Sequence, residues 1–240
     1  MRCAIVDYGS GNLRSAAKAL ERAARDFSIP AEILVTADAA AVQAADRVVI
    51  PGVGAFADCR AGLLGIPGMG AALEAARAAG KPMLGICVGM QLMAELGFEH
   101  GTHPGLGWVS GNIRRIAPAG DLRVPQMGWN RLSFPRPHPL LAGIEAGAFA
   151  YFVHSYALAE ANPAQVLAST DYGGPIVAAV VNGTVAGTQF HPEKSQETGL
   201  RLLANFLTWQ PAPMLQISVQ AQASAAAPDA HIGNTALTGS

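Results

Sequence analysis

The first half of the chain repeats one pattern: a short apolar run, a turn rich in glycine or proline, and a segment with apolar residues at helical spacing. The apolar runs predict four strands, at residues 3–6, 33–35, 48–50 and 83–86. Two segments rich in Ala and Leu predict helices, at residues 13–25 and 70–79. Because strands that alternate with helices pair in parallel, this half predicts an α/β fold with a parallel sheet.

The pattern changes after Leu96 to short β-like runs separated by Gly, Pro and Asn, which favours antiparallel pairing. Asn182-Gly183 lies between two apolar runs and predicts a hairpin with a type I′ turn, since both residues accept positive φ angles. We expect the second strand to continue to Phe190. We then expect a helix over residues 196–209, with a buried stripe of Leu200, Leu203, Phe206 and Leu207.

Length and composition set the domain organisation. A chain of 240 residues, at about 150 residues per typical domain, predicts one large domain with some additional chain. We expect the folded domain to span residues 1–209. Residues 210–240 are rich in Ala, Ser, Gln and Gly and poor in large apolar side chains, so they predict a disordered low-complexity tail, with a short docked helix as the alternative.

Composition also excludes several classes of function. Half of the residues are hydrophobic and 14% are charged, which allows a sizeable core. Sixteen basic and seventeen acidic side chains leave a net charge of −1, too little to hold nucleic acid by charge. No apolar run reaches the roughly 18 residues of a membrane span, and Asp7 interrupts any signal-peptide core. We therefore expect a cytoplasmic protein with no nucleic-acid or membrane partner.

The chain has three cysteines, and one of them lies in a motif for nucleophilic catalysis. Cys3, Cys59 and Cys87 are far apart and lack the spacing of zinc ligands, so neither disulfides nor a metal site is expected. The sequence G-I-C-V-G at residues 85–89 joins a buried strand to an amphipathic segment and predicts a strained nucleophile elbow. The amphipathic segment contains Met90, Leu92, Met93 and Leu96. The positive end of a helix there would favour the Cys87 thiolate, and Val88 N–H would serve as an oxyanion donor. The alternative is a small buried side chain without chemistry.

A thiolate nucleophile in acyl transfer needs a base and a group that orients the base. His191 and Glu193 supply both, because residues two apart in an extended segment point the same way and Pro192 stiffens the turn between them. His154 is the rival base. It lies inside a predicted strand with no acid two residues away, so we expect a structural role for it.

A glycine-rich turn, P-G-V-G at residues 51–54, follows a predicted parallel strand at the edge where open α/β folds bind ligands. Glycine allows close approach of the backbone, so the Val53 N–H is a candidate second oxyanion donor beside that of Val88. The alternative is a tight turn that binds nothing.

These motifs, in this order, resemble the class I (triad-type) glutamine amidotransferases. The elbow and the H-P-E motif are general in that family, whereas Y-G-S-G-N, P-G-V-G and M-G-W-N are more discriminating. The resemblance covers residues 1–209 through six segments, at residues 5–13, 51–56, 85–92, 125–130, 151–156 and 189–195. It implies a flavodoxin-like fold: a mostly parallel open sheet flanked by helices, with antiparallel hairpins in the second half.

The resemblance also implies the chemistry. Cys87 would attack the side-chain amide of L-glutamine and form a γ-glutamyl thioester with release of ammonia. His191 would act as base and acid, and Glu193 would orient its ring. The glutamine pocket would be formed by Gly52, Gln91, Glu99, Ser155 and Tyr156. No cofactor and no metal is implied.

The implied partner is a (β/α)8-barrel cyclase subunit, in a heterodimer that makes imidazole glycerol phosphate for histidine synthesis and an aminoimidazole carboxamide ribonucleotide. By analogy, four residues would lie near the subunit interface: Asn12, Trp129, Tyr151 and Lys194. Glycine lets the Gly52-Val53 peptide rotate at a small cost in conformational energy. We therefore expect this peptide to gate the reaction, with the Val53 N–H turned away until the partner binds its substrate.

Three other functions remain open at this point. The same chemistry could serve another synthase, such as one that makes pyridoxal phosphate or anthranilate; the M-G-W-N motif disfavours this. A regulatory or scaffold subunit could keep the fold without turnover, which the intact Cys87, His191 and Glu193 disfavour. A stand-alone cysteine peptidase or γ-glutamyl hydrolase would act without any partner.

Overall fold

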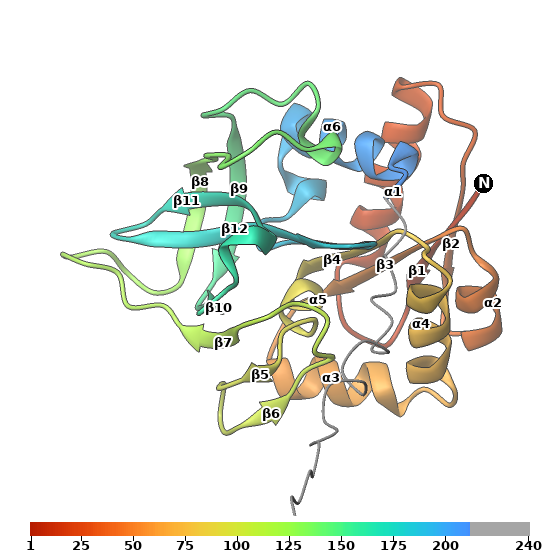
Figure 1. Ribbon diagram of the computed structural model, residues 1–240, viewed down its shortest axis with the longest axis horizontal. Coiled ribbons are helices and arrows are strands. Elements are labelled where there is room, and N and C mark those ends of the chain that lie inside the picture. Colours follow the sequence, from red (N-terminus) through yellow and green to blue (C-terminus); the bar gives the residue numbers. More distant parts are fainter. Residues whose placement is uncertain (212–240) are drawn as a thin grey trace, which may run out of the picture.

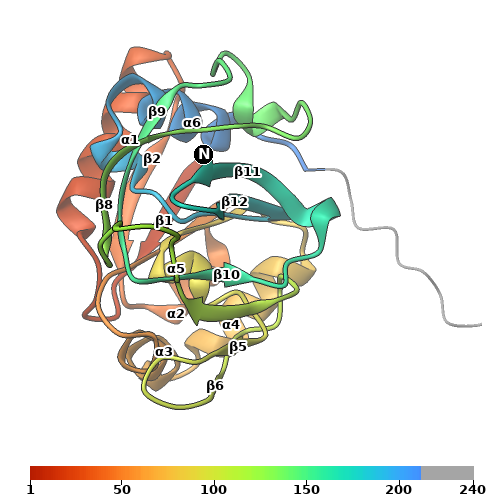
Figure 2. The same ribbon diagram turned by 90° about the vertical axis from the view of Figure 1, so that its left-hand side faces the viewer.

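The computed structural model describes residues 1–211, and the part of the predicted tail from 212 to 240 lies outside the described residues. A seven-stranded sheet with strand order β11-β12-β13-β4-β3-β1-β2 forms the centre of the molecule (Figures 1 and 2). Its five consecutive parallel strands are β1 (Arg2–Val6), β2 (Glu32–Thr36), β3 (Arg47–Gly52), β4 (Met83–Cys87) and β13 (Val185–Thr188). All residues of β3 and β4 are buried, as expected for strands covered on both faces.

Helices cover both faces of the sheet, with α1 and α6 above the strands and α3 and α4 below them in Figure 1. α1 buries the stripe Ala16, Leu20 and Ala23 and packs against α6. The bounds of the helices are α1 Leu13–Asp26, α2 Ala39–Ala44, α3 Phe56–Gly65, α4 Met69–Ala78, α5 Val88–Gln91 and α6 Gln196–Thr208. The three predicted helices are therefore confirmed within one residue at each end.

The second half adds the antiparallel part of the fold. β11 (Val166–Asp171) and β12 (Pro175–Asn182) extend the main sheet. β8 (Gln126–Arg131) pairs with β9 (Phe149–His154). A small sheet contains β5 (Leu96–Gly97), β6 (His103–Pro104), β7 (Asn112–Arg115) and β10 (Tyr156–Ala159). Short 3-10 helices are η1 (Pro139–Leu141), η2 (Pro163–Gln165) and η3 (Pro192–Lys194). The predicted mostly parallel α/β fold is confirmed.

Three local predictions were wrong. The hairpin exists, but Asn182 pairs with Val185 and is the last residue of β12, so the two loop residues are Gly183 and Thr184. A type I′ turn requires a positive φ at both loop residues, whereas here Gly183 has a φ of 58° and Thr184 has no positive φ. β13 ends at Thr188 rather than at Phe190. α5 is a single turn, and Leu96 belongs to β5, so a long helix dipole is not available to Cys87.

The topology brings the candidate residues to one edge of the sheet. Gly52 at the end of β3 pairs with Cys87 at the end of β4, and on the other side of β4, Thr188 pairs with Ile86. The segment that follows β13 and carries His191 therefore lies next to Cys87. Carboxyl ends of neighbouring parallel strands are where open α/β sheets bind ligands.

Candidate active site

Cys87 occupies a strained turn between β4 and α5. Its φ of 54° and ψ of −111° are unusual for a side chain other than glycine. The flanking glycines are required by space: a Cβ on Gly89 would lie 1.8 Å from the Ile50 carbonyl oxygen, and one on Gly85 would lie 2.6 Å from the Met90 nitrogen. The local geometry is that of the predicted nucleophile elbow, with the sulfur turned toward the segment after β13.

His191 is held by its backbone. Its N–H donates to the Tyr151 carbonyl (3.0 Å), and its own carbonyl accepts from the Ser195 hydroxyl (2.6 Å). Ser195 Oγ also accepts from the Tyr151 N–H (3.0 Å), so β9 and the residues around η3 are tied together. Pro192 opens η3 directly after His191. The ring is therefore presented from a segment with little freedom to move.

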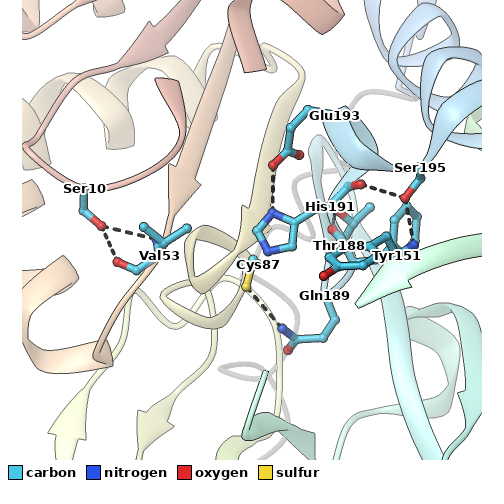
Figure 3. A network of polar contacts seen from close by, with 10 residues as sticks. Ser10, Val53, Cys87, Tyr151, Thr188, Gln189, His191, Glu193 and Ser195 are labelled. Carbon is cyan, nitrogen blue, oxygen red and sulfur yellow. Dashed lines mark hydrogen bonds and ion pairs between the residues drawn. The ribbon is translucent and has the colours of Figure 1, made fainter. Parts of the chain in front are cut away.

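The structure brings Cys87, His191 and Glu193 together (Figure 3). His191 Nδ1 lies 2.8 Å from Glu193 Oε1, and each side chain is only 3% exposed. The far side of the imidazole ring faces the Cys87 side chain (Figure 3). The carboxylate selects the tautomer that carries a proton on Nδ1 and leaves Nε2 for the sulfur. This is the arrangement that a thiolate nucleophile and its general base require.

The surroundings keep His191 protonated over a wide range of pH. Burial by itself lowers the pKa of a histidine, but hydrogen bonds and charge interactions with Cys87 and Glu193 outweigh burial here and raise the pKa of His191 to about 9. The ring therefore favours the form in which an imidazolium faces the sulfur on one side and a carboxylate on the other.

We expect the alkaline limb of glutamine hydrolysis to follow His191. Because the raised pKa is about 9, kcat/KM should fall as the pH rises through about 9, where the ring loses the proton needed by the leaving nitrogen. Glu193→Gln removes a charge that raises this pKa, so the limb should move to lower pH. The measurement is a pH–rate profile from pH 6 to 10.5.

The matched control is Glu21→Gln, which removes an exposed carboxylate on α1. Its profile should overlay that of the unmodified protein. An alkaline limb at the same pH in Glu193→Gln would contradict the assignment of this limb to His191.

The Val53 peptide is held away from the elbow by Ser10. Val53 N–H donates to Ser10 Oγ (3.2 Å), and the same hydroxyl donates to the Val53 carbonyl (2.6 Å). Cys59 Sγ lies 3.2 Å from that carbonyl and 3.1 Å from Ser10 Oγ. Tyr8 donates its hydroxyl proton to the Pro51 carbonyl. In Figure 3 the Ser10 contacts lie on the side of Val53 away from Cys87, so the candidate oxyanion donor is occupied elsewhere.

The other candidate donor needs no such rearrangement. Val88 is the first residue of α5, where a backbone N–H has no partner within its own helix. It follows Cys87 directly. Gly52 is confined beside it, because a Cβ there would lie 2.6 Å from the Gly89 nitrogen. The Gly52-Val53 peptide therefore runs close to the elbow even though its N–H is engaged with Ser10.

The predicted glutamine-pocket residues Gln91, Glu99, Ser155 and Tyr156 make hydrogen bonds within the chain. Gln91 Nε2 donates to the Tyr156 carbonyl (2.8 Å) and to Gln189 Oε1 (3.0 Å). The Ser155 carbonyl accepts from the Ile116 N–H (2.9 Å). Glu99 accepts from the N–H of Phe56 at the start of α3 (2.8 Å). These bonds leave acceptor capacity for a ligand, because a carboxylate has two oxygens and a carbonyl oxygen has two lone pairs.

His154 has the structural surroundings predicted for it. Burial lowers its pKa to about 4, so the ring is neutral at neutral pH. Its Nδ1 lies 3.0 Å from the Tyr156 carbonyl, which can only accept a hydrogen bond, so the ring carries its proton on Nδ1. No carboxylate is among the groups that shift its titration. It thus differs from His191, which has an acid partner.

Three of the four predicted interface residues, Trp129, Tyr151 and Lys194, lie close together. Trp129 on β8 is 43% exposed and packs edge to face on Tyr151 of β9, with ring centroids 5.8 Å apart. Lys194 Nζ lies 5.7 Å from the centre of the Tyr151 ring. Asn12 precedes α1 and shares a cavity of about 10 Å³ with Val53, His191 and Glu193. That cavity has room for at most about one water molecule, so the site is closed on this side.

A cavity of about 960 Å³, lined by residues of β7, β10, β11 and β12 and their loops, lies apart from Cys87, His191 and Glu193. Within residues 1–211, no group of three or more His, Cys, Asp or Glu side chains is placed to hold a metal ion. Over the same described residues, no helix combines the length and apolarity of a membrane span.

Sequence reasoning missed four residues of the site: Ser10, Tyr8, Cys59 and Gln189. Ser10 stood in a recognised turn, but its contact with Val53 spans 43 positions and has no local signal. Gln189 did carry one. It lies two residues before His191 near the end of the predicted second strand, so the alternation used to pair His191 with Glu193 would also have turned Gln189 toward the site. In the structure β13 ends at Thr188 and Glu193 lies in η3, so neither pair is part of a regular strand.

A family model described as glutamine amidotransferase class-I matches residues 4–209. The chain belongs to this family. The amidotransferase is 61% identical over 214 residues to the imidazole glycerol phosphate synthase subunit HisH of Rhodospirillum rubrum, covering 88% of this chain and 100% of that relative. It is 57% identical over 216 residues to the HisH subunit of Mesorhizobium japonicum, covering 88% of this chain and 100% of that relative.

Solved structures agree on the fold. PurLQS from Thermotoga maritima superposes with a TM-score of 0.64 at 19% identity, covering 86% of the amidotransferase and 97% of that chain. At this identity the likeness shows the fold alone. The family and its HisH branch, by contrast, are shown by sequence, and the resemblance drawn from the motifs is confirmed.

Proposed function

We propose that this chain is the glutaminase subunit of imidazole glycerol phosphate synthase, with residues 1–209 as its catalytic domain. The observation that carries the proposal is the placement of the His191 ring, which faces the Cys87 side chain on one side and lies 2.8 Å from the Glu193 carboxylate on the other. The two HisH relatives, at 57% and 61% identity over their whole length, support the choice of synthase.

The first half-reaction breaks the amide C–N bond of glutamine. The Cys87 thiolate attacks the side-chain carbonyl carbon, and the negative charge moves to the carbonyl oxygen. Backbone N–H groups of Val88 and, after reorientation, Val53 stabilise that oxygen. The His191 imidazolium gives its proton to the departing nitrogen, so that ammonia leaves and a γ-glutamyl thioester remains.

The second half-reaction restores the enzyme. Neutral His191 takes a proton from water, and the resulting hydroxide attacks the thioester carbon. The C–S bond breaks, its electron pair returns to sulfur, and glutamate is released. Glu193 keeps the ring in one tautomer and stabilises the imidazolium that forms in both halves.

The ammonia passes to a (β/α)8-barrel cyclase. That partner combines it with phosphoribulosyl formimino aminoimidazole carboxamide ribonucleotide, yielding imidazole glycerol phosphate and aminoimidazole carboxamide ribonucleotide. An exposed surface beside the site supports docking: Met127 is 63% exposed and Trp129 43% exposed, close to Tyr151 and Lys194. Large apolar side chains exposed together are typical of protein interfaces.

The partner also turns on the reaction. With the Val53 N–H bound to Ser10 Oγ, the isolated subunit lacks one oxyanion donor. Removing one such donor costs about 10²–10³ in rate. Gly54, with a φ of 99°, and Gly52 flank Val53 and permit the peptide to rotate. Binding of the cyclase and its ribonucleotide releases Val53 from Ser10 and completes the site.

We expect a rise of about 10²–10³ in glutaminase rate when the cyclase and its ribonucleotide are both present. The measurement is glutamate release by the isolated subunit, by the subunit with cyclase, and by the complex with ribonucleotide. Equal rates in all three would contradict the gate. Co-purification with the cyclase tests the choice of partner separately, because a different synthase would leave the cyclase unbound.

The strained elbow disfavours a catalytically silent subunit. A φ of 54° at Cys87 is costly and persists where the turn presents a nucleophile. Labelling of Cys87 by a glutamine-mimicking electrophile distinguishes an active glutaminase from a scaffold.

A further inference from the structure

Gln189 is a fully buried amide between two residues of the site. Its Oε1 accepts from Gln91 Nε2 at 3.0 Å, and its Nε2 lies 3.6 Å from the sulfur of Cys87 (Figure 3). The Gln189 side chain is 0% exposed, so water cannot satisfy its amide hydrogens. A buried amide requires partners of this kind, and the sulfur is the one available to its nitrogen in the described structure.

The neighbouring contacts determine which end of the Gln189 amide faces the sulfur. The Tyr156 carbonyl can only accept, so the Gln91 atom that contacts it must be the NH₂ nitrogen. That same nitrogen contacts Gln189, so the Gln189 atom facing it must be the oxygen. The NH₂ group of Gln189 is thereby directed at Cys87.

Backbone hydrogen bonds hold Gln189 and the neighbouring His191 in place. Gln189 N–H donates to the Ala178 carbonyl of β12 (2.8 Å). His191 N–H is bound to Tyr151. The amide is thus held against the sulfur before any substrate arrives, and no ordering is needed at the moment of reaction.

We propose that Gln189 is a second hydrogen-bond donor to the Cys87 sulfur, which stabilises the thiolate together with His191. In forming the thiolate, the sulfur's proton goes to His191, while Gln189 keeps both amide protons and only donates a hydrogen bond. When the thioester C–S bond later breaks, the electron pair returns to sulfur and meets the same donor. Hydrogen bonds to a charged acceptor are stronger than neutral ones, so the contact favours the thiolate over the thiol.

The inference rests on the proposed role of Cys87 as nucleophile, but its test needs neither glutamine nor the cyclase. The probe is iodoacetamide, which reacts with the thiolate, on the isolated full chain. The rate of Cys87 alkylation is followed from pH 5 to 10 by mass spectrometry of the Cys87 peptide, which separates it from Cys3 and Cys59.

Two substitutions remove the donor in different ways. Gln189→Met keeps the length of the side chain and removes the amide. Gln189→Glu keeps an oxygen for Gln91 and replaces the donor by a second oxygen beside the sulfur. We expect alkylation at pH 7 to slow about tenfold in Gln189→Met and further in Gln189→Glu, with the half-maximal rate moved to higher pH. If Gln189→Met fails to fold, Gln189→Glu still decides.

The matched control is Thr188→Val, which removes a buried hydrogen bond from the same segment without contacting the sulfur. It should alkylate within about twofold of the unmodified protein. An unchanged profile in the Gln189 variants, or an equal change in Thr188→Val, overturns the inference. Normal glutaminase activity alongside an unchanged profile would leave the proposed function standing. Slowed alkylation in a protein that never hydrolyses glutamine would leave the donor and reject the function.

Discussion

Replacing Cys87 by alanine is expected to abolish glutamine hydrolysis while ammonium salts still support cyclisation by the partner. Without the sulfur no thioester forms, and the oxyanion donors and His191 cannot replace the nucleophile. Loss of a nucleophile of this kind costs roughly 10⁴-fold or more in kcat. The cyclase uses free ammonia, so its own step should be unaffected. The measurements are glutamate release and ribonucleotide turnover, with glutamine or ammonium chloride as the nitrogen source.

Cys3→Ala is the matched control for this experiment. Cys3 is buried in β1, and burial raises the pKa of its thiol to about 12, so it is an inert side chain at neutral pH. The variant should retain both activities. Glutaminase activity that persists in Cys87→Ala, above the level of a blank without enzyme, rejects Cys87 as the nucleophile.

Replacing Ser10 by alanine should raise the glutaminase rate of the isolated subunit by about tenfold to 10²-fold. The hydroxyl makes two hydrogen bonds to Val53, one from its N–H and one to its carbonyl. Alanine removes both. Val53 is 43% exposed, so water can replace these contacts and the peptide is free to turn toward Cys87. The variant should therefore populate the active orientation of the Val53 peptide without the partner. The gain in rate cannot exceed the contribution of one oxyanion donor.

The fully activated rate separates release of Val53 from damage to the site. In the proposed gate, binding of cyclase and ribonucleotide releases Val53 from Ser10, so the Ser10→Ala complex should match the unmodified complex. The ratio of the glutaminase rate of the full complex to that of the isolated subunit should therefore fall, because the rate of the isolated subunit rises. Ser15→Ala, at a half-buried serine of α1, serves as the control and should leave both rates unchanged. A lower rate under both conditions, or an unchanged rate in the isolated subunit, contradicts the Ser10 contact as a restraint.

Most elements of the fold were predictable because their signals are local. Alternation of apolar runs with amphipathic segments predicted β1, β2, β3, β4, α1 and α4, and the apolar stripe near the end predicted α6. α3 was not predicted, since Gly62 and the charged residues within it break a clean periodicity. The length of α5 was also wrong, because Ala94 and Glu95 hydrogen-bond to other parts of the chain rather than continuing the helix.

The sequence by itself determined the family and selected Cys87, His191 and Glu193, because a strand-to-helix elbow and an H-P-E turn impose their chemistry over a few neighbouring residues. The direction of the Val53 N–H and the donor facing the sulfur were decided only by the tertiary structure. Ser10 reaches Val53 across 43 positions, and Gln189 reaches Cys87 across 102. Such contacts depend on which strand ends the sheet topology brings together, and no short stretch of sequence specifies that.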